Sequence, residues 1–115
     1  MKTGFGWIEI GGETYNNDII IHTDGSITRR LKKRSKHLKA LYGHTPLSPD
    51  ELDILEEEHP DVVFVGRGQY GDLPITPEAQ EQLSSYQAII GPTPDLLHTM
   101  ETEKRRYVAI LHITC

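Results

Sequence analysis

A repeated pairing of a proline-capped helix start with an apolar strand limits most strongly how this chain can fold. A hydroxyl residue followed by proline places a side-chain cap and a pre-formed first helical residue together, and it occurs at Ser48-Pro49, Thr76-Pro77 and Thr93-Pro94. Glu51 would complete a capping box with Ser48. An apolar stretch follows each predicted helix, at 62–66, 87–90 and 106–114. Strands separated by helices require crossover connections, so 62–66 and 87–90 are predicted to be parallel.

The first third of the chain carries a different pattern. Alternating apolar residues over 7–31 predict an antiparallel meander of three strands, with turns at Gly11-Gly12 and Asp24-Gly25. The second of these strands is predicted to run through the whole stretch from Thr14 to Thr23. Residues 32–47 are predicted as a loop, with room for a helical turn at 36–41. The predicted fold class is therefore α/β, a layered core with an attached meander.

Length and composition narrow the class of protein. The 115 residues suit one domain. The one cysteine, Cys115, cannot form an internal disulfide, which fits a reducing cytosol. The first residues lack the apolar core of a signal peptide, and no stretch has the length of a membrane helix. The six histidines form no metal-binding motif, so we expect no metal or cofactor. The cysteine content and the first residues favour a cytoplasmic protein without a membrane partner.

Charge is distributed unevenly along the chain. The net charge is −5, yet residues 29–39 hold seven of the twelve basic residues, while 50–61 is strongly acidic. The two segments could face each other and partly cancel. The overall acidic balance argues against nucleic acid as the main partner, and 29–39 lacks the interleaved aromatic residues that stack on bases. A solvated loop or a patch for an acidic partner is the preferred interpretation of 29–39, and RNA contact is the weaker alternative.

Residues 66–71 read Gly-Arg-Gly-Gln-Tyr-Gly after an apolar strand, which matches the spacing of a dinucleotide-binding turn. In that turn the helix begins inside the glycine motif, so that its amides meet the pyrophosphate. Here the next helix begins only at about Thr76, and no acidic residue ends the following strand. The sequence also lacks the Lys-Ser/Thr of a phosphate-binding P-loop. We therefore predict no dinucleotide site.

Two interpretations of this loop stay open, a tight connection and a small anion-accepting pocket. In the second, the Arg67 guanidinium donates two hydrogen bonds to the anion, and amides of the loop donate further ones. Loops after neighbouring parallel strands meet at the carboxyl edge of the sheet, where α/β proteins place their ligands. The candidate ligand-binding residues are Gly66, Arg67, Gly68, Tyr70, Gly71, Thr93 and His112. Strand alternation points His112 and Cys115 to opposite faces, so no thiol–imidazole pair is expected.

Four segments resemble the family of small proteins with the MTH938-like fold: "FGWIEIGGETYNNDIIIHTDGSI", "VVFVGRGQYGDL", "IIGPTPDLLHTM" and "RRYVAILHITC". Their order and spacing span nearly the whole chain. The resemblance implies a single three-layer domain over 1–115, in which a β-meander packs with an α/β/α core. It further implies a mixed sheet whose last strand runs antiparallel. It implies no established activity.

These features give two functional hypotheses. The first is a non-enzymatic binding or assembly domain that uses a cleft between the loops at 66–72 and 91–93 and the C-terminal strand. Its partner would be a protein or a small anionic ligand. The alternative is a small enzyme acting on an anionic metabolite held by Arg67, with Tyr70 or His112 transferring protons. The sequence does not specify an oligomeric state.

Overall fold

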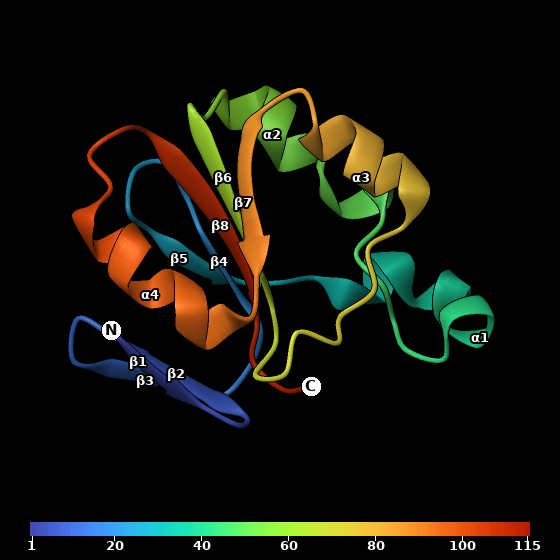
Figure 1. Cartoon of the computed structure of the whole chain (residues 1–115), viewed down its shortest axis with the longest axis horizontal. Helices are drawn as coiled ribbons and strands as arrows, with labels where there is room; N and C mark the ends of the chain where they lie inside the picture. The colour runs from blue at the N-terminus through green and yellow to red at the C-terminus, as the bar shows by residue number, and fades with distance from the viewer.

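A mixed sheet of five strands forms the middle layer of the molecule (Figure 1). The computed structural model describes residues 1–115. In spatial order the strands are β5 (Ile27–Arg29), β4 (Ile19–Ile21), β8 (Tyr107–His112), β6 (Val62–Arg67) and β7 (Gln87–Gly91). The predicted parallel pairing of 62–66 with 87–90 is confirmed, since β6 runs parallel to β7. The α/β fold class is confirmed as well.

The direction of the last strand differs from the expectation that the family resemblance gave. β8 is antiparallel to β4 but parallel to β6. The reason is the crossover through α4 (Thr93–Thr102), which carries the chain back over the sheet before β8 begins. The expectation was therefore correct for β4 and wrong for β6 and β7.

The N-terminal strands divide between two sheets. β1 (Lys2–Gly4), β2 (Trp7–Ile10) and β3 (Glu13–Tyr15) form a separate antiparallel sheet, whereas β4 and β5 pair in the main sheet. The predicted three-strand meander over 7–31 was therefore wrong, because its strands belong to two different sheets. Asn16, Asn17 and Asp18 interrupt the predicted second strand, because these residue types favour turns over strands. The predicted turn at Asp24-Gly25 connects β4 to β5 as expected.

The two faces of the main sheet are both covered. The helices α2 (Asp53–Glu58) and α3 (Pro77–Leu83) lie on one face, and α4 and the small sheet lie on the other (Figure 1). Alternate side chains of β6 enter the two cores, Val62 and Phe64 with α4, Val63 and Val65 with α2 and α3. A strand buried on both faces needs apolar residues at every position, which explains the uninterrupted apolar run.

Side-chain caps form at two of the three predicted helix starts, at Ser48 and Thr76 but not at Thr93. The Thr76 hydroxyl accepts from the Ala79 amide at 3.1 Å, as a cap should. Ser48 accepts from Asp50 rather than closing a capping box with Glu51, and a short 3-10 helix, η2 (Pro49–Glu51), precedes α2. Thr93 is the first residue of α4, and its side chain does not cap the helix. Glu51 and Thr93, which miss their predicted capping roles, bond elsewhere in the fold, as described below.

Residues 32–42 contain more helical structure than the predicted loop with one helical turn at 36–41. They form a 3-10 helix, η1 (Lys32–Leu38), followed by α1 (Lys39–Tyr42). From there the chain runs to Leu47, which forms an isolated bridge with Ile75. None of the helices combines the length and the apolar character that crossing a bilayer requires.

Candidate functional site

The glycine loop lies where the sequence places it, at the carboxyl edge of the parallel strands. Gly66 pairs with Gly91 across β6 and β7, and Arg67 pairs with His112 across β6 and β8. The chain stretches after these positions therefore leave the sheet side by side. This edge of the sheet is the expected place for a ligand in an α/β fold.

The C-terminal residues occupy the space that the loop encloses, and Figure 1 shows the C-terminus beside the loop after β6. The amide of Gln69 donates to the Thr114 oxygen at 2.7 Å. The amides of Tyr70 and Asp72 donate to the Cys115 oxygen at 3.2 and 3.1 Å. The donors that were predicted to receive an anion are therefore satisfied within the chain.

Close packing explains the glycines of the loop. A Cβ atom on Gly66 would come within 2.5 Å of the Thr93 hydroxyl. Thr93 is fully buried, and its hydroxyl donates to the His112 oxygen at 2.6 Å while accepting from the Gly68 amide at 3.1 Å. This pair of bonds is why Thr93 does not cap α4. Gly66, Gly68 and Thr93 thus join β6, β8 and α4 rather than lining a cleft.

The other loop residues also bond or pack within the chain. Arg67 donates through Nε to the Leu73 oxygen at 2.8 Å. Tyr70 is 71% exposed, and its ring centroid lies 6.3 Å from that of Phe5. Gly71 lies against the ring of Pro92. The loop is therefore closed by its own neighbours.

A pocket of about 180 Å³ lies on the other side of the C-terminal residues. Of the seven predicted ligand residues, only His112 lines it. Asp72 and Thr114 also belong to segments of the predicted cleft, whereas the rest of the lining comes from residues that the sequence analysis did not assign to it: Arg30, Lys32, Lys39, His44, Thr45, Leu73 and Cys115. The pocket at this edge is thus displaced from the glycine loop towards η1 and α1.

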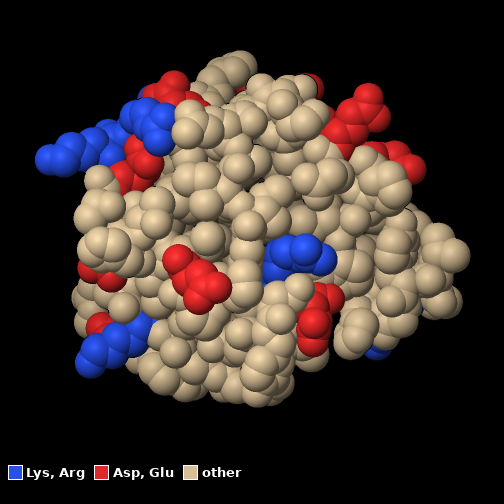
Figure 2. All heavy atoms as spheres, viewed as in Figure 1, with Lys and Arg blue, Asp and Glu red and all other residues tan.

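A larger open hollow of about 500 Å³ adjoins this pocket and shares Arg30, Lys32, Lys39 and Thr45 with it. Five exposed basic residues line the hollow, and we call it the basic groove: Arg29, Lys32, Lys33, Lys36 and Lys39. None of the five forms an ion pair, although the acidic segment lies close by. On the face drawn in Figure 2, by contrast, basic side chains lie beside acidic ones.

The other side of the basic segment does face the acidic segment, as the sequence suggested. Arg34 contacts Asp53 at 2.9 Å, and His37 lies 3.5 Å from Asp50. Arg30 pairs with Glu51 at 2.7 Å in the interior. The expectation that the two charged segments partly cancel is therefore confirmed for one side of η1 only.

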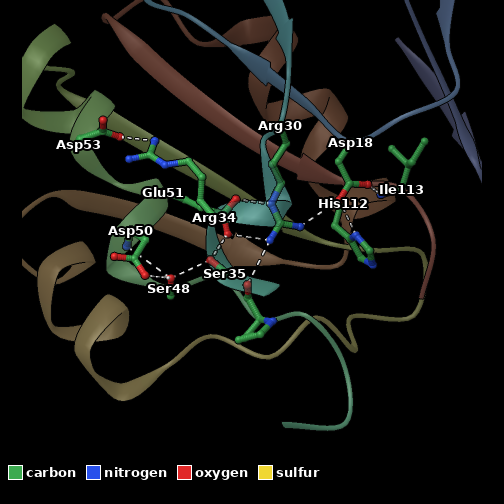
Figure 3. A network of polar contacts seen from close by, with 11 residues as sticks. Asp18, Arg30, Arg34, Ser35, Ser48, Asp50, Glu51, Asp53, His112 and Ile113 are labelled. Carbon is green, nitrogen blue, oxygen red and sulfur yellow. Dashed lines mark hydrogen bonds and ion pairs between the residues drawn. The ribbon is translucent and has the colours of Figure 1, made fainter. Parts of the chain in front are cut away.

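Arg30 is the centre of a buried polar network, drawn in Figure 3. Its guanidinium donates twice to Glu51, at 2.7 and 3.0 Å, and once to Asp18 at 2.9 Å. Its side chain is 1% exposed. Burial would lower the pKa of Arg30, but its bonds to Glu51 and Asp18 outweigh this effect and raise it. Arg30 therefore stays charged in the core.

Two buried serines extend the network to the basic segment. Ser35 of η1 donates to Glu51 at 2.6 Å and lies 2.7 Å from the Ser48 hydroxyl. Both serines are fully buried. Because Ser35 lies in the middle of η1, these bonds hold the backbone that carries the basic groove.

Asp18 connects the network to His112 and so to the pocket. Its carboxylate accepts from Arg30, from His112 Nδ1 at 2.8 Å and from the Ile113 amide at 3.0 Å. Burial would raise the pKa of Asp18, but His112, Arg30 and the Ile113 amide outweigh it and lower the pKa below 3.8. An ionised carboxylate only accepts, so His112 Nδ1 carries a proton. Its Nε2 lies 3.1 Å from the Thr114 hydroxyl.

No local pattern in the sequence pointed to this network, although the expectation that the two charged segments face each other covers its Arg30–Glu51 pair. Arg30 stood within a run of exposed bases, Glu51 fitted a capping box, and Asp18 fitted the interior of a predicted strand. No group of three or more His, Cys, Asp or Glu side chains is arranged to hold a metal ion. The pocket lining presents lysine, histidine and hydroxyl groups, which can donate hydrogen bonds to an anion.

We predict that Gly68→Ala destabilises the protein by about 3 kcal/mol, because the new Cβ would overlap Cys115 at a left-handed backbone position. Gly25→Ala is the matched control, since its φ of +86° resembles the +95° of Gly68 but no atom lies within 4 Å. Backbone strain alone should cost Gly25→Ala about 1 kcal/mol. Urea unfolding of both variants measures the difference, and equal losses would contradict the packing described here.

We also predict that Asp18→Asn lowers the free energy of unfolding by about 3 kcal/mol near neutral pH, because it leaves buried Arg30 with one carboxylate. The folded-state pKa of Asp18 is lowered, so its contribution is present above the unfolded-state pKa and is lost as pH falls through the folded-state pKa. The gap between the wild type and the variant should therefore be constant down to about pH 5 and shrink below about pH 4.

Urea unfolding across this pH range measures that gap. Glu81→Gln, an exposed carboxylate on α3 without an ion pair, should change stability by less than about 0.5 kcal/mol. A gap for Asp18→Asn that is unchanged at about pH 3 would show that charge pairing is not its source.

Comparison with solved structures places this fold in a family. The chain is 35% identical to the conserved hypothetical protein PH1505 from Pyrococcus horikoshii OT3, with a TM-score of 0.85 over 100% of this chain and 98% of that chain. It is 29% identical to a protein designated MT938, with a TM-score of 0.77 over 100% and 96% of the two chains. A protein from Bordetella parapertussis, 19% identical with a TM-score of 0.61 over 96% and 91% of the two chains, shares the fold.

No protein-family model and no curated protein matches the sequence. The match to PH1505 nevertheless extends over the full chain, and neither it nor MT938 carries a stated activity. This chain belongs to the MTH938-like family.

Proposed function

We propose that this protein is a binding or assembly domain, without chemistry of its own, that holds an acidic segment of a partner protein in the basic groove. One observation carries the proposal. Five exposed basic side chains lie together without an ion pair in a protein whose net charge is −5. Like charges held together repel, and an anionic partner removes that repulsion.

The backbone beneath the groove supports a binding role. Ser35 and Arg30 bond to buried Glu51, so the segment that carries the bases is fixed before any partner arrives. A fixed surface loses less conformational entropy on binding than a flexible loop does. The groove therefore suits a partner that arrives extended and acidic.

An acidic protein segment is favoured over nucleic acid. The apolar lining of the groove is a single leucine, Leu31, and no aromatic side chain lines it. Single-stranded nucleic acid relies on aromatic side chains for base stacking. The remaining surface charge is acidic overall, which repels a long polyanion.

The residues predicted from the sequence have different parts in this proposal. His112 belongs to the pocket that adjoins the groove. Gly66, Gly68 and Thr93 hold the C-terminal residues that form the wall of that pocket. A cleft between the 66–72 and 91–93 loops is not part of the proposal, because residues 114 and 115 bond to the loop amides there.

Charge reversal in the groove tests the proposal. Lys33→Glu with Lys36→Glu should weaken binding of a fluorescently labelled polyglutamate peptide by about tenfold or more, since each lost contact contributes up to about 1 kcal/mol. Fluorescence anisotropy measures the affinity. Binding of the wild-type protein should weaken as salt is raised.

The matched control is Lys2→Glu with Lys104→Glu, which changes the net charge equally at two exposed positions outside the groove. It should weaken binding less than about threefold. Equal losses in both double variants would reduce the effect to net charge and refute the proposal. So would tighter binding of a single-stranded RNA than of the peptide.

A small enzyme acting on an anionic metabolite is the second candidate, and the Asp18–His112 pair at the pocket wall favours it. A histidine oriented by a carboxylate can transfer protons. Arg67 has no part in this version, since its Nε bonds to Leu73 and it does not line the pocket. Turnover of a phosphate or carboxylate metabolite that is lost in His112→Gln, while folding is preserved, would replace the binding proposal.

A further inference from the structure

The pocket beside the basic groove is too small to hold the body of a ligand. Its volume is about 180 Å³, whereas pockets for drug-sized ligands measure roughly 300–1,000 Å³. Its apolar lining is confined to Leu73 and Cys115, and no Phe, Tyr or Trp side chain lines it. A nucleobase together with its sugar would therefore not find room in it. The pocket suits one small charged group.

The donors around the pocket suit an oxyanion with more than one negative charge. Lys32 and Lys39 contribute ammonium groups that make no ion pair, and His44 lies on the same lining. Thr45 and Thr114 contribute hydroxyl groups. A phosphate monoester carries about −1.5 to −2 charges and three acceptor oxygens. Two lysines, a histidine and two hydroxyls match it better than they match a carboxylate.

The wall opposite the lysines is rigid. His112 is held by Asp18, and the Thr114 hydroxyl lies against His112 Nε2. The Thr114 oxygen accepts from Gln69, and the Ile113 amide donates to Asp18. One acidic group, Asp72, lines the pocket besides these. The part of the wall formed by His112 and Thr114 is therefore fixed by bonds that do not depend on a ligand.

The pocket and the basic groove meet at shared residues. Lys32 and Lys39 line both, whereas His44 lines the pocket alone and Lys33 and Lys36 line the groove alone. A ligand can therefore extend along the groove with one side group in the pocket. We propose that the pocket binds the phosphate group of a phosphorylated residue within an acidic segment, and the acidic part of this inference rests on the proposed function above.

Four matched peptides and two protein variants test the inference. The first three peptides are acidic and differ at one central position, which is serine, phosphoserine or glutamate. The fourth carries the phosphoserine between neutral residues. Anisotropy gives the affinity of each peptide, and inorganic phosphate is added as a competitor. The wild-type protein should bind the acidic phosphopeptide about tenfold or more tightly than its serine form, because two unpaired ammonium groups meet the added charge.

The variants separate the pocket from the groove. His44→Glu should reduce the preference for the phosphopeptide to less than about threefold and leave the affinity for the serine peptide within about twofold. Lys33→Glu with Lys36→Glu should weaken both peptides alike and preserve the preference. His98→Glu, the same change at an exposed position of α4, should preserve both affinities.

Each contrary outcome has a distinct meaning. A wild-type protein that binds the serine, glutamate and phosphoserine peptides equally overturns the phosphate pocket and leaves the proposed function standing. If the neutral phosphopeptide or inorganic phosphate binds as tightly as the acidic phosphopeptide, the pocket recognises the phosphate group alone. That outcome overturns the proposal that the phosphate lies within an acidic segment. A protein that binds none of the peptides overturns both proposals. If His44→Glu still prefers the phosphopeptide over the serine peptide, the phosphate does not bind in this pocket.

Discussion

One buried guanidinium, that of Arg30, determines how the middle of this chain is arranged. Removing an arginine from water is costly unless carboxylates replace the lost hydration, and Arg30 recruits Asp18 from the start of β4 and Glu51 from η2. It also donates to the Pro46 oxygen. These partners come from three separate stretches, so their positions relative to β5 are fixed together. Ser35 bonds to the same carboxylate of Glu51, and through it the arrangement includes η1.

The exposed charge of the molecule follows from this interior arrangement. With Ser35 buried, η1 has one side against the acidic segment and another against solvent, and only Arg34 and His37 on the first side lie against carboxylates. A flexible loop would separate its like charges, because the repulsion between them is relieved by distance. The anchored helix cannot do so. The unpaired charge of the basic groove is therefore a consequence of the buried polar network, and an acidic ligand would complete what the fold leaves unbalanced.

The sequence predicted the elements whose signals are local and failed where a distant partner competes for the same side chain. The run at 62–66 is apolar because both faces of β6 are covered. Thr76 caps α3, and no distant group competes with the Ala79 amide for its hydroxyl oxygen. The local sequence predicts just as clearly that Glu51 closes a capping box with Ser48. Glu51 leaves that role because a bidentate bond to a guanidinium is stronger than a bond to a neutral amide. Arg30 is 21 residues away, and no periodicity connects the two.

The glycine loop illustrates a subtler limit. Its glycines correctly indicated that something approaches the backbone closely, but a glycine does not distinguish a ligand from another part of the chain. Here the approaching atoms belong to Thr93, Thr114 and Cys115. The same C-terminal residues that fill the loop form the wall of the phosphate-sized pocket, with Asp72 and Leu73 at its border. The predicted cleft and the pocket thus lie on opposite sides of a single strand end, and the path of residues 113–115 decides which side is open.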